Sequence, residues 1–342
     1  MINHLTGLRV IEEGALRVAP LLGLADVVSS NGWNLPDIVV AAGLPADVLS
    51  HPENTISVFD ADRLLTLAAR RLDCPHVGLL VGKDTGLGTL GRIGRVAGGA
   101  RDAGAALRGI LVALHLHDRT TVPSLKVQGA VATLSTVSLS QGGEGAAIVA
   151  DLTMMACFNI VRELCGPAWK PRQVRLARRR PAGTGPYVKA FGQRPVFDAG
   201  FNALEFDAAW LRAPLPADRR RSAEPFDHRA VARSLDPASQ VRRACVTALI
   251  EGDPSVARLA VLLNSSRRTL NRRLAFLGTT ARAQLGTART LIAQQLLAAT
   301  TLSITHIAGL LGYSDGGAFT RAFSRSAGIS PSEWRRQRSS NG

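Results

Sequence analysis

The sequence has 342 residues, of which 46% are hydrophobic, and this length predicts two domains because it exceeds what one core usually holds. The formal net charge is +15 and is unevenly placed: residues 1–168 carry 13 basic and 15 acidic side chains, whereas residues 229–342 carry 16 and 5. A basic second half is typical of a domain that neutralises phosphates, and the longest apolar stretch, residues 145–160, is too short and too polar for a membrane span.

The cysteines indicate a reduced, intracellular protein. They are Cys74, Cys157, Cys165 and Cys245. No Cys-x-x-Cys pair and no histidine at metal-ligand spacing accompanies them, so we expect mostly buried thiols, no metal and no other cofactor. Glu12 and Glu13 interrupt the first 23 residues where a signal peptide would be apolar. We therefore expect a cytoplasmic protein.

Residues 1–211 are predicted to form one mixed α/β domain. Helical spacing of apolar residues occurs at residues 21–30, 38–42, 60–72, 103–116 and 146–165. Alternating or β-branched residues predict strands at residues 124–127, 131–139 and 173–176. Residues 212–237 are rich in proline and arginine and are expected to be a linker, with a short helix near residues 228–235.

Residues 238–338 are predicted to be all helical and to contain two copies of a helix-turn-helix pattern, at residues 255–276 and 303–326. One apolar face recurs in both copies, as Val256, Leu259, Ala260 and Leu263 and again as Ile304, Ile307, Ala308 and Leu311. A helix over residues 281–299 would connect the copies. Its 19 residues, at about 1.5 Å each, suit two reading helices set roughly one DNA turn, about 34 Å, apart.

The second helix of each copy carries side chains suited to a DNA groove. We expect contacts from Ser266, Arg267, Arg268, Thr269, Asn271, Arg272 and Arg273, and from Ser314, Asp315, Thr320, Arg321 and Arg325. Arginine binds guanine through two hydrogen bonds, asparagine does so with adenine, and hydroxyls hold phosphates. Gly316 and Gly317 should loosen the start of the second reading helix. A Ser330-Pro331 start with Glu333 predicts a capped final helix.

These motifs, in this order, resemble the AraC/XylS-type transcription regulators. The resemblance rests on residues 266–274, 307–315, 318–323 and 328–331. It implies a seven-helix module that places two helix-turn-helix motifs in successive major grooves, although Gly317 stands where relatives usually have serine or another polar residue. The first half is similar to the ligand-binding domain of one branch of that family, in residues 42–45, 77–91, 191–197 and 202–206. That similarity implies an effector sensor; no effector-contacting residue is predicted.

Three sequence motifs suggest cofactor binding, catalysis or metal binding, but in each case a purely structural role is the better interpretation. Gly86-Leu87-Gly88-Thr89-Leu90-Gly91 fits a dinucleotide fingerprint, but the acid that should follow about 20 residues later is missing. Cys74-Pro75-His76 suggests a methyl-accepting thiol, but no basic group follows to activate it. His115 and His117 are expected at a helix end, where they would point apart.

We therefore predict a sequence-specific transcription regulator, with double-stranded DNA and a small-molecule effector as partners. RNA polymerase and a second copy of the chain are further expected partners, and no membrane is. No catalytic residue is predicted. Two alternatives stay open: a DNA-repair or other enzyme fused to an AraC-type DNA-binding module, and an architectural DNA binder that ignores sequence.

Overall fold

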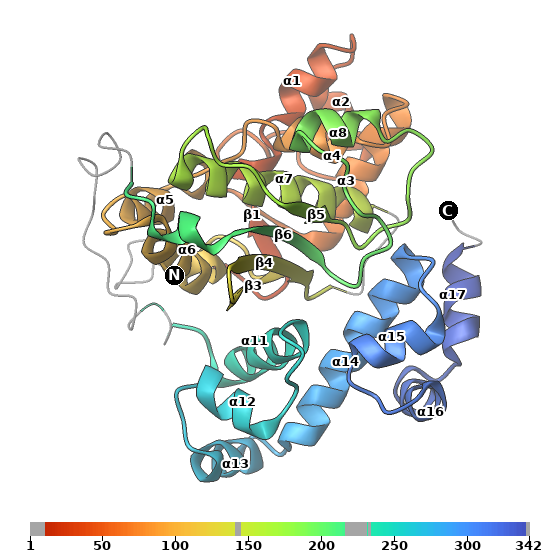
Figure 1. The fold of residues 1–342 in the computed structure, drawn as a ribbon. Helices are drawn as coiled ribbons and strands as arrows, with labels where there is room; N and C mark the ends of the chain where they lie inside the picture. Colours follow the sequence, from red (N-terminus) through yellow and green to blue (C-terminus); the bar gives the residue numbers. More distant parts are fainter. Residues whose placement is uncertain (1–10, 141–144, 216–230, 232–233, 340–342) are drawn as a thin grey trace.

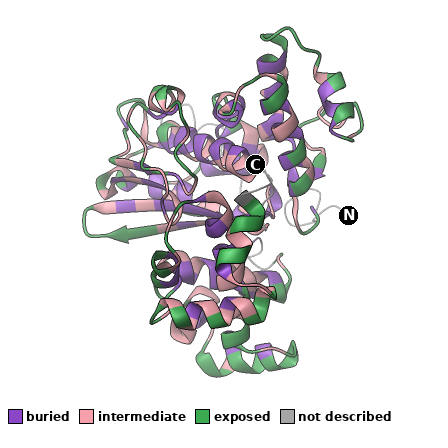
Figure 2. Ribbon diagram, turned by 90° about the vertical axis from the view of Figure 1, so that its right-hand side faces the viewer, coloured by how far each residue is buried: buried purple, intermediate pink, exposed green. Residues whose placement is uncertain are grey.

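The computed structural model describes residues 11–140, 145–215, 231 and 234–339. An N-terminal unit combines helices with two sheets, and a C-terminal unit is helical throughout its described residues (Figure 1). The predicted division into a mixed α/β part and an all-α part is confirmed. Buried side chains line the inner faces of both units, and exposed ones cover the outer faces of the C-terminal helices (Figure 2).

The first third of the chain forms a helical layer around its own apolar cluster. A short antiparallel pair, β1 (Ala15–Arg17) and β2 (Thr55–Ser57), closes one side of it. The helices of this layer are α1 (Leu24–Ser29), α2 (Leu35–Ala41), α3 (Val58–Arg71) and α4 (Val77–Gly82), whereas Ile93 and Ala97 of α5 (Arg92–Ala97) belong to a second apolar cluster. Helix α4 packs tightly on α7 (Ala146–Cys165), since a Cβ atom at Gly78 would lie 2.1 Å from the carbonyl oxygen of Ile148.

The main sheet has four antiparallel strands in the order β3-β4-β6-β5. They are β3 (Thr121–Gln128), β4 (Val131–Ser138), β5 (Gln173–Arg175) and β6 (Asn202–Asp207). Side chains alternate between its two faces. Leu134, Leu204 and Phe206 point into the core shared with α6 (Ala103–Ala113), α7 (Ala146–Cys165) and α8 (Gly185–Phe191).

The opposite face of that sheet is covered by the C-terminal unit. Val122 and Val137, directly paired across β3 and β4, belong to the apolar cluster of the C-terminal helices. Ser124, two residues along β3, donates from its hydroxyl to the Glu251 carboxylate at 3.2 Å. The sheet therefore lies between the N-terminal helices and the C-terminal unit (Figure 1).

The C-terminal unit contains seven helices within its described residues. They are α11 (Pro237–Ile250), α12 (Val256–Leu262), α13 (Arg267–Phe276), α14 (Ala281–Ala299), α15 (Ile304–Leu310), α16 (Gly316–Ala327) and α17 (Pro331–Ser339). Helix α14 has the predicted bounds, and the Thr280 hydroxyl caps it by accepting the N–H of Ala283. The capping box of α17 is also confirmed, because Ser330 and Glu333 accept each other's backbone N–H.

Several elements differ from the sequence predictions. Strand β6 and helices α4, α5 and α8 were not predicted. Of the four cysteines, which were expected to be mostly buried, Cys245 is buried and the others are partly exposed. The glycine-rich residues 86–91 follow helix α4 rather than a strand, so the dinucleotide fingerprint lacks its structural context. Most of the predicted short helix at residues 228–235 lies outside the described residues.

Candidate nucleic-acid interface

Helices α12 and α13 form the first helix-turn-helix unit. Ser255 caps α12 by accepting the N–H of Arg258, and the chain turns at Asn264, whose φ of +45° lies in the left-handed region. Asparagine tolerates this conformation better than most residues with a Cβ atom. Ser266 then caps α13 by accepting the N–H of Thr269 at 3.1 Å. Local hydrogen bonds thus set the direction in which α13 leaves the turn.

One face of α13 is anchored in the core and the other is open. Leu270 and Leu274 are 1% exposed and fix the inner face. At about 100° per residue, the positions opposite to them are Arg268, Arg272 and Phe276. All three are exposed, Phe276 to 91%. Of the predicted contacts in this helix, Arg268 and Arg272 are therefore the ones that point most directly outward.

Helices α15 and α16 repeat this geometry 48 to 49 residues later. Gly312, with a φ of +72°, makes the turn, and Phe319 and Phe323 anchor the inner face of α16. Arg321 then occupies the outward position that Arg272 has in α13, and Arg325 corresponds to Phe276. Both Arg321 and Arg325 are exposed.

The outward face of α16 is less densely charged than that of α13, because Gly317 stands at the position of Arg268. Thr320 is half-buried, and its hydroxyl donates to the carbonyl oxygen of Gly316 at 2.8 Å. The N-terminus of α16 nevertheless has a hydrogen-bonded start. Asp315 accepts the N–H of Ala318 at 2.7 Å and the hydroxyl of Ser314 at 2.9 Å.

These hydrogen bonds assign a structural task to residues that were predicted to contact DNA. They keep the pKa of Asp315 below its usual range, with the Ala318 N–H as the main cause, so its carboxylate is charged at neutral pH. A negative charge at a helix N-terminus is stabilising. Ser266 and Asp315 therefore act first as caps that orient the two reading helices.

The arginines of α13 and α16 form no close ion pairs within the described chain, although Arg321 contributes to the lowered pKa of Asp315. Within the described chain, Arg267, Arg268, Arg272, Arg273, Arg321 and Arg325 form no ion pair with a carboxylate. Figure 1 shows α13 beside the start of α14 and α16 on the opposite side of α14, so that α14 runs between them. The arrangement offers two positively charged helices to one extended polyanion.

Helix α14 also fixes the second unit. The Arg289 side chain donates from Nε to the carbonyl oxygen of Leu311 at 2.9 Å, and its guanidinium lies 5.2 Å from the centre of the Tyr313 ring. Trp334 of α17 donates from its indole N–H to the carbonyl oxygen of Gln294 at 3.3 Å. The connecting helix is therefore bonded to the turn and to the final helix of the second unit.

Contacts between the N- and C-terminal units were missed by the sequence analysis. Arg243 of α11 donates to the carbonyl oxygen of Thr121 at 2.7 Å, and Lys126 of β3 donates to that of Glu251 at 2.8 Å. On the other side, Asp198 accepts the N–H of Thr301 at 2.6 Å. No local pattern signals these contacts, because each joins residues more than 100 positions apart.

Features that suggested catalysis or metal binding have structural explanations. Burial raises the pKa of the Cys74 thiol, which disfavours the thiolate that a methyl acceptor needs. His115 lies at the predicted helix end, with Nδ1 2.9 Å from the carbonyl oxygen of Val112 and Nε2 2.8 Å from the Ser234 hydroxyl. Burial lowers the pKa of His115 to about 4, so the ring is neutral at pH 7.

The described ranges contain neither a cluster of metal-ligating side chains nor a membrane-spanning helix. No cluster of three or more His, Cys, Asp or Glu side chains there could hold a metal ion. Among the helices of the residues that the structure describes, none combines the length and the apolar character of a membrane span.

Both units of the chain are similar to parts of known proteins. A family model described as the arabinose-binding domain of AraC transcription regulators, N-terminal, matches residues 32–215, and a helix-turn-helix model matches residues 259–337. The ornithine utilization regulator of Pseudomonas aeruginosa is 26% identical over 325 residues, which cover 93% of this chain and 95% of that protein. The HTH-type transcriptional regulator VirS of Mycobacterium tuberculosis is 25% identical over 340 residues, which cover 95% and 98%. Among solved structures, the transcriptional regulator CdpR from Pseudomonas aeruginosa is 23% identical, with a TM-score of 0.42, and the match covers 88% of this chain and 96% of that one.

Proposed function

The chain belongs to the AraC family of transcription regulators, whose N-terminal family model covers more than half of it, and on this premise we propose that it binds a specific operator in response to a small-molecule effector. Residues 1–211 are the effector domain in this proposal, residues 212–237 the linker and residues 238–338 the DNA-binding domain. The fused-enzyme alternative loses support, because the N-terminal model is that of AraC transcription regulators, the relatives that match nearly the whole chain are named regulators, and the pKa of Cys74 is raised.

The equivalent positions of Arg272 and Arg321 carry the proposal. Each is exposed, lies opposite the buried face of its helix and has no carboxylate partner in the described chain. We infer that these two arginines read bases in successive major grooves. Arg268 and Asn271 would read neighbouring bases in the first groove, and Arg325 would contribute in the second.

The remaining predicted contacts are assigned to the phosphate backbone. Helix N-termini present unpaired N–H groups and a partial positive charge to phosphates. Ser266, Thr269, Ser314 and Asp315 lie at the starts of α13 and α16, and they would hold these N–H groups in place. Arg273 and Thr320 lie on the flanks of their helices, and Arg267 is exposed at the first position of α13; these three would contact flanking phosphates.

Selection from a random duplex library tests sequence specificity, since a regulator enriches one motif and an architectural binder enriches none. The motif should contain two short elements separated by about 10 base pairs, the repeat of one DNA turn. Affinity for the selected duplex should also fall steeply with salt, because each neutralised phosphate contributes about 0.9 to the slope of log K against log salt. A flat salt response with no enriched motif would reject the proposal.

The proposal has consequences for partners and location. A transcription regulator acts where the DNA is, so we propose a cytoplasmic protein that contacts RNA polymerase at its promoters. A homodimer would double the number of operator elements read at once. Analytical ultracentrifugation, with and without operator, would distinguish one bound chain from two.

A further inference from the structure

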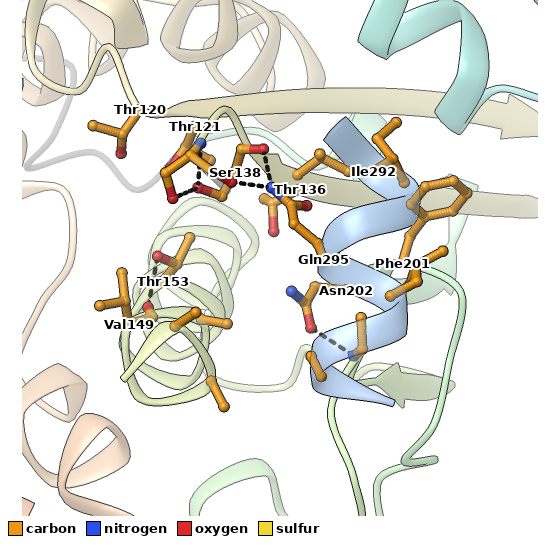
Figure 3. A pocket seen from close by; sticks show the side chains of 18 of the residues that line it. Thr120, Thr121, Thr136, Ser138, Val149, Thr153, Phe201, Asn202, Ile292 and Gln295 are labelled. Atoms are coloured by element: carbon orange, nitrogen blue, oxygen red, sulfur yellow. Dashed lines mark hydrogen bonds between the residues drawn. The ribbon is translucent and has the colours of Figure 1, made fainter. Parts of the chain in front are cut away.

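A cavity of about 100 Å³ lies where the N- and C-terminal units meet (Figure 3). Its walls include Ala150 and Thr153 of α7, Thr121 of β3, and Ile292 and Gln295 of α14. A cavity of about 150 Å³ holds benzene, so this one suits a molecule of about four to six heavy atoms. Any molecule bound there would contact the sheet, α7 and the helix that connects the two reading units.

The lining favours an uncharged molecule. About half of it is alanine, valine, isoleucine and leucine side chains, interspersed with hydroxyls and amides, and none of the described lining residues is lysine or arginine. The lining contains one carboxylate, Asp62, whose Oδ1 accepts the N–H of Gly145 at 2.7 Å at the start of α7. An anion would therefore meet a carboxylate and no basic side chain among the described lining residues, whereas a cation at Asp62 would compete with the Gly145 N–H for the carboxylate that holds the start of α7.

Two polar groups face the cavity without a partner of their own. The hydroxyl of Thr121, a residue only 7% exposed, makes no hydrogen bond within the described chain. Asn202 uses its Oδ1 to accept the N–H of Ala177 at 2.8 Å, and its amide nitrogen points into the space between α7 and α14 (Figure 3). Both groups donate hydrogen bonds, so they match an oxygen acceptor.

We propose that this cavity is the effector site, and that it takes a small uncharged molecule with a carbonyl, amide or hydroxyl oxygen. The inference rests on the proposed function, because it names the site and the ligand chemistry of that effector.

The position of the cavity explains how binding would reach the DNA-binding helices. Gln295 of α14 lies in the cavity wall and donates from Nε2 to the carbonyl oxygen of Ser138 at 2.8 Å and to that of Ser140. Ile292, Gln295, Leu296 and Ala299 form one face of α14 against the cavity. A ligand shifts an equilibrium only if it contacts the two arrangements differently. In this proposal the ligand binds the arrangement in which α14 is docked on the sheet and forms part of the cavity wall. The ligand would lose its contacts with α14 in an arrangement in which α14 has moved away.

Three probes of nearly equal size test the ligand chemistry on the full chain: propionamide, propionate and propylamine, which is an ammonium ion at pH 7. We expect propionamide to bind saturably in a ligand-observed NMR titration, with a dissociation constant on the order of millimolar, as befits about five heavy atoms. Propionate should bind at least about tenfold more weakly, because it would meet the Asp62 carboxylate and no basic side chain among the described lining residues. Propylammonium should also bind at least about tenfold more weakly, because it has no oxygen to accept hydrogen bonds from Thr121 and Asn202.

Variants locate the binding. Ala150→Leu fills the cavity from α7 and should weaken propionamide binding by about tenfold or more, whereas Ala156→Leu makes the same change on α7 outside the lining and should leave it unchanged. Thr121→Val keeps the shape and removes the hydroxyl, and should weaken binding about threefold to tenfold. Thermal unfolding of each variant checks that it is folded.

The outcomes separate this inference from the proposed function. No saturable propionamide binding, equal binding of all three probes, or unchanged binding by Ala150→Leu would each overturn the effector-site assignment. Operator affinity is measured on the same preparations without probe. If the unmodified chain binds no operator, that result would instead count against the proposed regulator function, whatever the probe titrations show.

Discussion

Replacing Arg272 or Arg321 by alanine should remove one base contact from one end of the operator. The two arginines occupy equivalent outward positions on α13 and α16, opposite side chains that are 1% exposed. A two-hydrogen-bond contact from arginine to guanine discriminates by about 1 to 3 kcal/mol, which is roughly fivefold to 150-fold in the dissociation constant. Each single variant should lose this much affinity for the selected duplex.

The double variant gives a quantitative check. The 19 residues of α14 extend about 28 Å, so the two arginines are too far apart to share a partner. Changes separated by more than about 10 Å add within about 0.5 kcal/mol. Arg272→Ala/Arg321→Ala should therefore lose about 2 to 6 kcal/mol, the sum of the two single losses.

Fluorescence anisotropy at fixed salt measures the affinities, and library selection with each variant measures base preference. Arg272→Ala should relax preference at one element and Arg321→Ala at the other, about 10 base pairs away. Arg194→Ala is the matched control, since it removes an exposed arginine of the N-terminal unit and should change neither quantity. Unchanged affinity and an unchanged motif in both single variants would refute the assigned reading positions.

Three further tests address the fold and its electrostatics: a pair of glycine substitutions, the removal of a buried carboxylate and a change of pH. Gly316→Ala should stabilise the protein by about 0.5 to 1 kcal/mol, because the new Cβ would have its nearest neighbour at 3.5 Å in a regular helix. Gly312→Ala should destabilise the protein, because the φ of Gly312 is +72° and the new Cβ would lie 3.2 Å from the Pro254 side chain. Urea unfolding of the two variants measures both changes in the free energy of unfolding. Asp151→Ala should cost about 3 to 5 kcal/mol in the same assay, because it leaves the buried guanidinium of Arg178 without its carboxylate, and a loss below about 1 kcal/mol would contradict the pairing. His115 alone should lower the free energy of unfolding by about 3 kcal/mol as the pH drops from 6.5 to 4, because the unfolded chain binds a proton on His115 that the folded chain, with a pKa of about 4, does not. His117 acts in the same direction and the raised pKa of Asp151 in the opposite one, so the contribution of His115 is the difference between the slope of the unmodified chain and that of His115→Gln.

The C-terminal unit was predictable because its signals are local. Ser266, Asp315 and the Ser330–Glu333 pair each form their capping bonds within three residues. The bounds of α14 follow from Gly278 and Thr280 for the same reason. Such bonds depend on neighbours that are visible in any short window of sequence.

The N-terminal unit was less predictable because its partners are distant in the chain. Strand β6 is defined by its pairing with β4, as in Leu204 opposite Leu134. The two strands are far apart in the sequence, so no local pattern predicts their pairing. Helix α4 has the composition of a strand, and its glycines are explained only by the close approach of α7. The cavity likewise joins α7 to α14, and the bond from Gln295 to Ser138 spans 157 positions.

The covering of the main sheet by α11 has a practical consequence for work with shortened chains. A truncation after residue 211 would retain Val122 and Val137 but remove the helices that bury them to 2% and 5%. It would also leave β3 as an uncovered edge, and apolar edges of this kind invite self-association. Such a fragment would be expected to aggregate, and a weak small-molecule response from it would reflect a missing wall rather than a missing ligand.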